Sequence, residues 1–106
     1  MPHYMFRATY TQKGIEGTKE GTAVSRIPAW RETFASLGGR FETAYWTLGD
    51  EDIVIIGEFP DAVAAVTASV QGRLAGTGKV TTTALLTAEE FDRALTGEID
   101  YKPLPE

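Results

Sequence analysis

Two charged residues of opposite sign, Arg7 and Glu58, are the best candidates in this sequence for holding a small ligand. Both fall in segments with strand character, and we expect them on the sheet face that no helix covers. If they are buried together, Arg7 is the better anchor, because its planar guanidinium binds a carboxylate through two parallel hydrogen bonds. The simpler interpretation is a cross-strand salt bridge between them that sets the register of the sheet.

Two aromatic residues, Tyr45 and Trp46, are consecutive in a predicted strand, so their side chains point to opposite faces. We expect one to fill the core beneath the first helix. The other could line a pocket between two sheets, because such a side chain offers an apolar wall with a polar tip. The alternative for both is packing in the core or at a subunit interface. The candidate ligand-binding residues are Arg7, Tyr45, Trp46 and Glu58. A cavity lined by Arg7, Trp46 and Glu58 would distinguish a binding protein from one that only assembles.

Catalytic and metal-binding groups are scarce. His3 is the only histidine, and we interpret it as an exposed strand residue, because a catalytic imidazole needs an orienting partner. The chain has no cysteine, which excludes disulfides, thiolate nucleophiles and cysteine-ligated metal sites. We therefore predict no catalytic residue, no metal site and no cofactor, and leave open whether any reaction is catalysed.

Two other polar segments have simple structural explanations. The acidic turn at 50–52, with Glu42, lacks the glycine and distal glutamate of a calcium loop, so we interpret it as a solvated turn that blocks edge pairing. The glycine-rich segment 11–22, with Lys13 and Lys19, lacks the spacing of a phosphate-binding loop. We expect a loop or a broken helical turn there, because three glycines disfavour a continuous helix, and this loop is the best candidate for a mobile lid.

Composition and charge narrow the class of protein. Hydrophobic residues make up 42% of the 106 residues and charged residues 24%, which is typical of one globular domain. We expect that domain at 1–97 and a tail at 98–106. The net charge of −5 disfavours nucleic acids and anionic membranes as partners. No segment approaches the roughly 20 apolar residues of a membrane span, and no signal region is evident, so we predict a cytoplasmic protein.

Apolar periodicity predicts the secondary structure. Strands are expected at 3–11, 40–48, 53–59 and 79–86, with 53–59 central because it is apolar on both faces. The first helix is expected to begin at Ser25 as N-cap, with Pro28 in its first turn, and to end at a left-handed Gly38. A capping box at Thr87 predicts a short terminal helix. The second helix, opening at 60–61, is expected to face the core with Val63, Val66, Val70 and Leu74.

The element order β-α-β-β-α-β with an extra C-terminal helix predicts an α+β, ferredoxin-like fold with a four-stranded antiparallel sheet. Two helices would cover one face of the sheet. The other face would show Met5, Val54, Ile56 and one aromatic from 44–46. Apolar area of this kind is rarely left exposed, so we predict that a second copy of the chain covers it in a homodimer or higher homo-oligomer.

The sequence resembles the GYD-domain family over nearly its whole length. The family is named after a Gly-x-Tyr-Asp-like turn, which here begins at Gly49 and ends at Asp52, with Glu51 where the family often has tyrosine. The resemblance implies a ferredoxin-like or dimeric α+β barrel fold, and it implies no established reaction. The matching segments are SLGGR at 36–40, YWTLG at 45–49, DIVII at 52–56, PD at 60–61, TTT at 81–83, LLT at 85–87 and EE at 89–90.

Three functions are compatible with these features. The first is a small-ligand binding or sensing module with a pocket between two facing sheets. The second is a structural protein whose role is self-assembly. The third is a cofactor-free or haem-using enzyme, which rests on analogy of fold alone. A haem would need an axial ligand, and His3, a tyrosine or a methionine would have to supply it.

Overall fold

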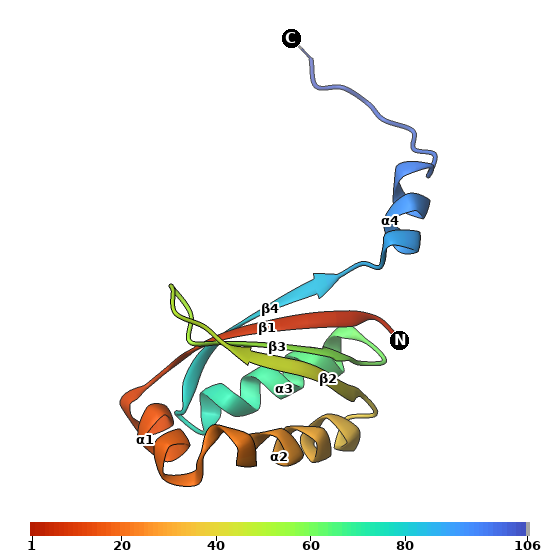
Figure 1. Cartoon of the computed structure of the whole chain (residues 1–106). Coiled ribbons are helices and arrows are strands. Elements are labelled where there is room, and N and C mark those ends of the chain that lie inside the picture. The colour runs from red at the N-terminus through yellow and green to blue at the C-terminus, as the bar shows by residue number, and fades with distance from the viewer. Residues whose placement is uncertain (106) are drawn as a thin grey trace.

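The computed structural model describes residues 1–105, and its elements follow the order β-α-α-β-β-α-β-α. The four strands form one antiparallel sheet, and the two longer central helices lie on one face of it (Figure 1). This confirms the predicted α+β fold and its four-stranded antiparallel sheet. The elements are β1 (His3–Tyr10), α1 (Gln12–Gly21), α2 (Ala23–Ser36), β2 (Arg40–Trp46), β3 (Ile53–Glu58), α3 (Ala62–Leu74), β4 (Gly78–Leu85) and α4 (Ala88–Leu95).

The sheet has the order β2-β3-β1-β4, so β3 is central as predicted, and β1 is central beside it. Alternate residues of β1 point toward the helices and form the core with Phe34 of α2 and Phe59. Phe59 is fully buried, and its ring centroid lies 4.7 Å from that of Phe34. Phe6 packs against both rings at 5.8 Å. Aromatic packing between β1, α2 and the end of β3 therefore holds the helices on the sheet.

The turn between β2 and β3 is anchored to β1 through Asp52. Its carboxylate accepts a hydrogen bond from the backbone N–H of Tyr10 at 2.8 Å, and its own N–H donates to the carbonyl of Ala8 at 2.9 Å. The antiparallel pairing of β2 with β3 confirms the predicted hairpin, and these bonds attach its tip to the end of β1.

The prediction of a loop at 11–22 was wrong, because this segment contains α1. Thr11 is the N-cap, and its hydroxyl accepts from the N–H of Gly14. Gly14 is buried where the helix meets the loop between α3 and β4, and a Cβ there would lie 1.8 Å from the carbonyl oxygen of Thr77. At Gly14, glycine therefore serves close packing and does not end the helix.

The start of α2 also differs from its prediction. Thr22 is the N-cap, with a φ of 75°, and its hydroxyl accepts from the N–H of Ser25. Ser25 is thus the third helical residue, and Pro28 lies in the second turn. The missing N–H of Pro28 leaves the carbonyl of Val24 without its helical partner. Val24 is exposed, so water can bond to that carbonyl. The predicted C-terminal end is confirmed, because Gly38 has a φ of 76°.

Helix α3 packs with the opposite face from the one predicted. Val63 and Leu74 are 76% and 75% exposed, and Val66 and Val70 are also exposed. Ala65 is fully buried instead, and Ala64 and Ala68 pack against the core. The aromatic rings beneath the helix already occupy the space, so only small side chains fit at the contact.

Helix α4 and residues 96–105 form an arm that projects beyond the end of β4, on the side of the sheet opposite α2 and α3 (Figure 1). The predicted capping box is present: Glu90 accepts from the N–H of Thr87 at 2.8 Å, and Thr87 accepts from the N–H of Glu90 at 3.1 Å. The arm raises the radius of gyration to 16.9 Å, against about 13 Å for a compact chain of this length. No helix in the described residues is both long and apolar enough to cross a bilayer.

Candidate functional site

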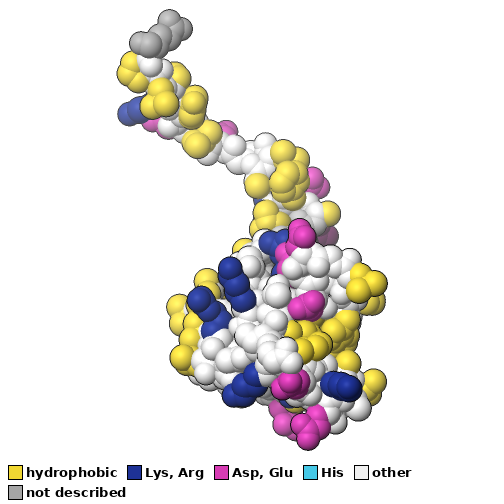
Figure 2. Space-filling model, turned by 90° about the vertical axis from the view of Figure 1, so that its left-hand side faces the viewer, with side chains coloured by type: hydrophobic (Ala, Val, Ile, Leu, Met, Phe, Trp, Pro, Cys, Tyr) yellow, Lys and Arg dark blue, Asp and Glu magenta, His cyan; other side chains and the backbone are white. Residues whose placement is uncertain are grey.

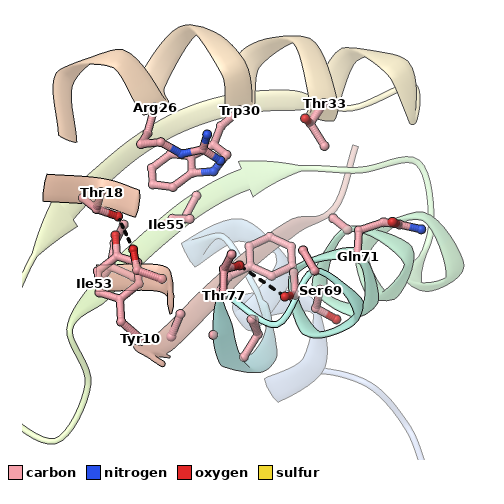
Figure 3. Close-up of a pocket in the computed structure, with 18 of the residues that line it drawn as sticks. Tyr10, Thr18, Arg26, Trp30, Thr33, Ile53, Ile55, Ser69, Gln71 and Thr77 are labelled. Atoms are coloured by element: carbon pink, nitrogen blue, oxygen red, sulfur yellow. Dashed lines mark hydrogen bonds between the residues drawn. The ribbon is translucent and has the colours of Figure 1, made fainter. Parts of the chain in front are cut away.

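A cavity of about 410 Å³ lies on the helix-covered side of the sheet, between α2 and α3, with α1 at one end (Figure 3). Phe6 and Ala8 of β1, Ile53 and Ile55 of β3 and Val80 of β4 contribute apolar side chains from the sheet. The helices and the loop after α3 contribute most of the remaining lining residues, together with Tyr10 of β1 and Gly78 of β4. The helix residues with polar side chains are Lys13, Thr18, Arg26, Thr33, Ser69 and Gln71.

The cavity exists because small residues replace large ones at one end of the helix layer. Phe34 and Phe59 fill the other end, as described above. Toward α1, three of the lining residues of α3 and its C-cap have little or no side chain, namely Ala68, Gly72 and Ala75. The sheet and the helices are held apart by the aromatic core, and these residues leave the remaining volume unfilled.

Helix α1 forms one end of the cavity and is bound to the loop after α3. The N–H of Thr11 donates to the carbonyl of Thr77 at 3.2 Å, and the Thr11 hydroxyl donates to the carbonyl of Gly76 at 2.6 Å. Lys13 Nζ donates to the carbonyl of Ala75 at 3.0 Å. These bonds set the position of Thr18, whose hydroxyl also lines the cavity.

Two aromatic lining residues are held in place by Trp46, which stands just outside the cavity. The rings of Trp30 and Trp46 are stacked, with centroids 5.8 Å apart and planes at 23°. The indole N–H of Trp46 donates to the hydroxyl oxygen of Tyr10 at 3.0 Å. Because that oxygen accepts from Trp46, the Tyr10 O–H proton remains available to a ligand.

The charged groups that line the cavity are both cationic, namely Lys13 and Arg26. The guanidinium carbon of Arg26 lies 5.7 Å from the centroid of the Trp30 ring, which is a cation–π distance. Arg26 and Trp30 both project from α2 toward the sheet (Figure 3). Within residues 1–105, no three acidic or histidine side chains come together as a metal site would require.

The predicted site residues do not line this cavity. Arg7 and Glu58 lie on the uncovered face as expected, but the salt bridge between them is not formed. Arg7 stands opposite Val54 and pairs with Glu51 at 3.2 Å, whereas Glu58 pairs with Arg40 and lies 3.6 Å from His3. The strand register places Arg7 and Glu58 apart along the sheet, so each pairs with a nearer residue of opposite charge.

Tyr45 and Trp46 point to opposite faces, with Trp46 on the helix side and Tyr45 opposite Val54 on the uncovered face. Trp46 therefore cannot share a cavity with Arg7 and Glu58, contrary to the prediction. Ligand binding by Arg7, Tyr45, Trp46 or Glu58 stays a prediction.

Sequence reasoning missed the residues of the helix-side cavity, because none of them forms a known motif. The available signal was the set of small residues at 64, 65, 68, 72 and 75, which is unusual for a helix that covers an apolar sheet.

The fold and the cavity together define a class: a single-sheet α+β domain with a split β-α-β arrangement and an apolar chamber beneath its helices. The GYD domain model matches residues 4–95, so the chain belongs to the GYD-domain family, which confirms the resemblance seen in the sequence. No curated protein and no solved structure matches this chain.

Proposed function

We propose that this protein is a small-ligand binding module and that the cavity between α2 and α3 is its binding site. The observation that carries the proposal is the cavity itself. Its volume of about 410 Å³ falls within the roughly 300–1,000 Å³ typical of ligand pockets. Its sheet side is mostly apolar, and a few polar groups from the helices and from Tyr10 of β1 converge on it. In ligand pockets, apolar walls of this kind supply most of the affinity, and a few polar groups fix the orientation of the ligand.

The polar groups can both donate to and accept from a ligand. The hydroxyl of Tyr10 has its proton to donate, as argued above. The hydroxyl of Thr18 donates to the carbonyl of Gly14 at 2.9 Å, which leaves its oxygen able to accept. The amide of Gln71 offers both functions. A ligand with an apolar ring and one polar substituent would satisfy this arrangement.

Binding can be tested with 2-naphthamide, a neutral probe with an apolar bicyclic body, by titration in ¹H–¹⁵N NMR spectra. At about 0.3 kcal/mol for each of roughly 13 non-hydrogen atoms, millimolar affinity is expected. The Trp30 indole and the backbone amide of Gly72 should shift together.

The matched variants are Gly17→Phe and Gly17→Ala. Gly17 lines the cavity, and no atom lies within 4 Å of a Cβ at this position, so a large side chain has room there and Ala is too small to block the cavity. We expect Gly17→Phe to abolish the shifts and Gly17→Ala to keep them. Equal binding by both variants would contradict the assignment of the site.

We also propose that the chain associates with a second copy through the uncovered face of the sheet, as a dimeric α+β barrel or a related homo-oligomer. Met5, Val54 and Ile56 lie side by side on that face. The arm rises on the same side and carries apolar side chains that its own domain does not cover (Figures 1 and 2). Phe91 and Leu95 on α4 are 54% and 67% exposed. In a dimer, the arm of each chain can pack on the uncovered sheet face of the other chain. The two contacts are equivalent, so the assembly is closed and has two-fold symmetry.

Light scattering after size-exclusion chromatography tests this association. The double substitution Phe91→Glu with Leu95→Glu should shift the protein toward monomer without unfolding it, because both side chains are exposed in the single chain. Leu74→Glu, at an equally exposed apolar position on α3, should leave the mass unchanged. A monomeric wild-type protein would refute the proposal.

A further inference from the structure

We infer that the cavity binds an organic anion, specifically a carboxylate on an apolar body the size of one or two rings. This inference rests on the proposed function and names the class of ligand. The chain has 15 acidic and 10 basic residues, yet both charged residues that line the cavity are cations. Acidic residues outnumber basic ones in the chain as a whole, whereas the charge at the cavity is positive. This positive charge attracts an anionic ligand and disfavours a cationic one.

Arg26 is the group best placed to bind the carboxylate. It lies one helical turn before Trp30, so the two side chains share a face of α2. The contact of 5.7 Å between the guanidinium carbon and the Trp30 ring holds Arg26 beside the cavity. A cation–π contact uses no N–H hydrogen bond, so the N–H groups of the guanidinium remain open to a carboxylate. The ion pairs found within residues 1–105 engage His3, Arg7 and Arg40, not Arg26.

Lys13 supplies a second positive charge from α1. Its ammonium donates one hydrogen bond to the carbonyl of Ala75, which fixes its position and leaves two N–H donors. The two cations come from different helices at the α1 end of the cavity, and the apolar sheet residues Ile55 and Val80 lie along its floor. The arrangement orients a ligand with its carboxylate toward α1 and α2 and its apolar body against the sheet.

Three probes of nearly equal size separate charge from shape: 2-naphthoate, 2-naphthamide and 2-naphthylmethylammonium. Each is titrated into the full-length protein and followed at the Trp30 indole by NMR. Because a charge-assisted hydrogen bond is about twice as strong as a neutral one, we expect 2-naphthoate to bind roughly tenfold more tightly than the amide. The ammonium should bind most weakly.

Arg26→Gln and Arg31→Gln form a matched pair of variants. Arg31 lies on the same helix with its guanidinium carbon 5.7 Å from the Phe41 ring, and it does not line the cavity. We expect Arg26→Gln to weaken 2-naphthoate roughly tenfold and to leave 2-naphthamide unchanged. Arg31→Gln should change neither affinity.

These measurements distinguish binding in the cavity from preference for an anion. Binding of 2-naphthamide as tightly as 2-naphthoate would overturn the anion assignment and leave the cavity as a binding site. An equal effect of both arginine variants would overturn the role of Arg26. If none of the three probes binds, the proposed function and this inference both fail.

Discussion

Replacing Gly14 and Gly17 by alanine should change stability in opposite directions, although both residues lie in α1. Alanine is favoured over glycine inside a helix by roughly 0.5–1 kcal/mol. At Gly17, where a Cβ would have no neighbour within 4 Å, this gain is the whole effect. At Gly14, a Cβ would lie 1.8 Å from the Thr77 carbonyl oxygen and 3.0 Å from a ring carbon of Tyr10. The closest contact is with backbone, which cannot rotate away.

The cost at Gly14 follows from what must move. Forcing a methyl group into a packed contact costs about 1–3 kcal/mol. Moving α1 away also stretches the two hydrogen bonds of Thr11 to residues 76 and 77, each contributing about 0.5–1.5 kcal/mol. After subtraction of the helix-propensity gain, we expect Gly14→Ala to lower the free energy of unfolding by about 1–5 kcal/mol, the upper end applying if both hydrogen bonds are lost. Gly17→Ala should raise it by about 0.5–1 kcal/mol.

Urea unfolding followed by circular dichroism measures both changes, and equal slopes for the three proteins would show that the comparison is of stability alone. The midpoints should fall in the order Gly17→Ala, wild type, Gly14→Ala, from highest to lowest. If Gly14→Ala is as stable as Gly17→Ala, then α1 does not pack against Thr77. Helix α1 would then not form one end of the cavity.

Three other predictions concern stability. Phe59→Ala should lower the free energy of unfolding by about 3–5 kcal/mol in urea, because the ring is fully buried; a loss under 1 kcal/mol would contradict its place in the core. Gly38→Ala should cost about 1–2 kcal/mol in thermal unfolding, because its φ of 76° is strained for any residue with a Cβ; an unchanged melting temperature would argue against the left-handed conformation. The hydrogen bonds from Thr87 lower the pKa of Glu90 below its usual 4.5, so α4 should keep its helicity above that pH and lose it as the pH falls through the lowered pKa. Glu90→Gln should remove this dependence in circular dichroism, and an acid transition of the same size in that variant would refute the role of Glu90.

Local signals made the strands and several helix ends predictable from the sequence. The capping box at Thr87 and the left-handed Gly38 each depend on residues within a few positions, so neighbouring sequence determines them. The apolar run that forms β3 likewise predicted its central place in the sheet, although no element within residues 1–105 covers the face that carries Val54 and Ile56.

The face that α3 turns to the sheet was not predictable in the same way. Its valine and alanine stripes both have helical spacing, and tertiary packing against Phe34 and Phe59 decides between them. The faces of Tyr45 and Trp46 depend on a register irregularity between Phe41 and Thr43, which interrupts simple alternation along β2. The cavity depends on both features and on the docking of α1, so sequence patterns alone did not indicate it.

The central place of β1 has a consequence for how the chain folds. β1 is the first strand to be synthesised, and its neighbour β4 is the last, with pairs running from His3–Leu85 to Tyr10–Gly78. Until the residues of β4 have left the ribosome, β1 has a free edge. Closing so long a loop is slow, because its entropy is lost before the pairing is gained. A fragment ending before β4 would keep that edge open to other chains, so premature termination should produce aggregates rather than a smaller folded domain.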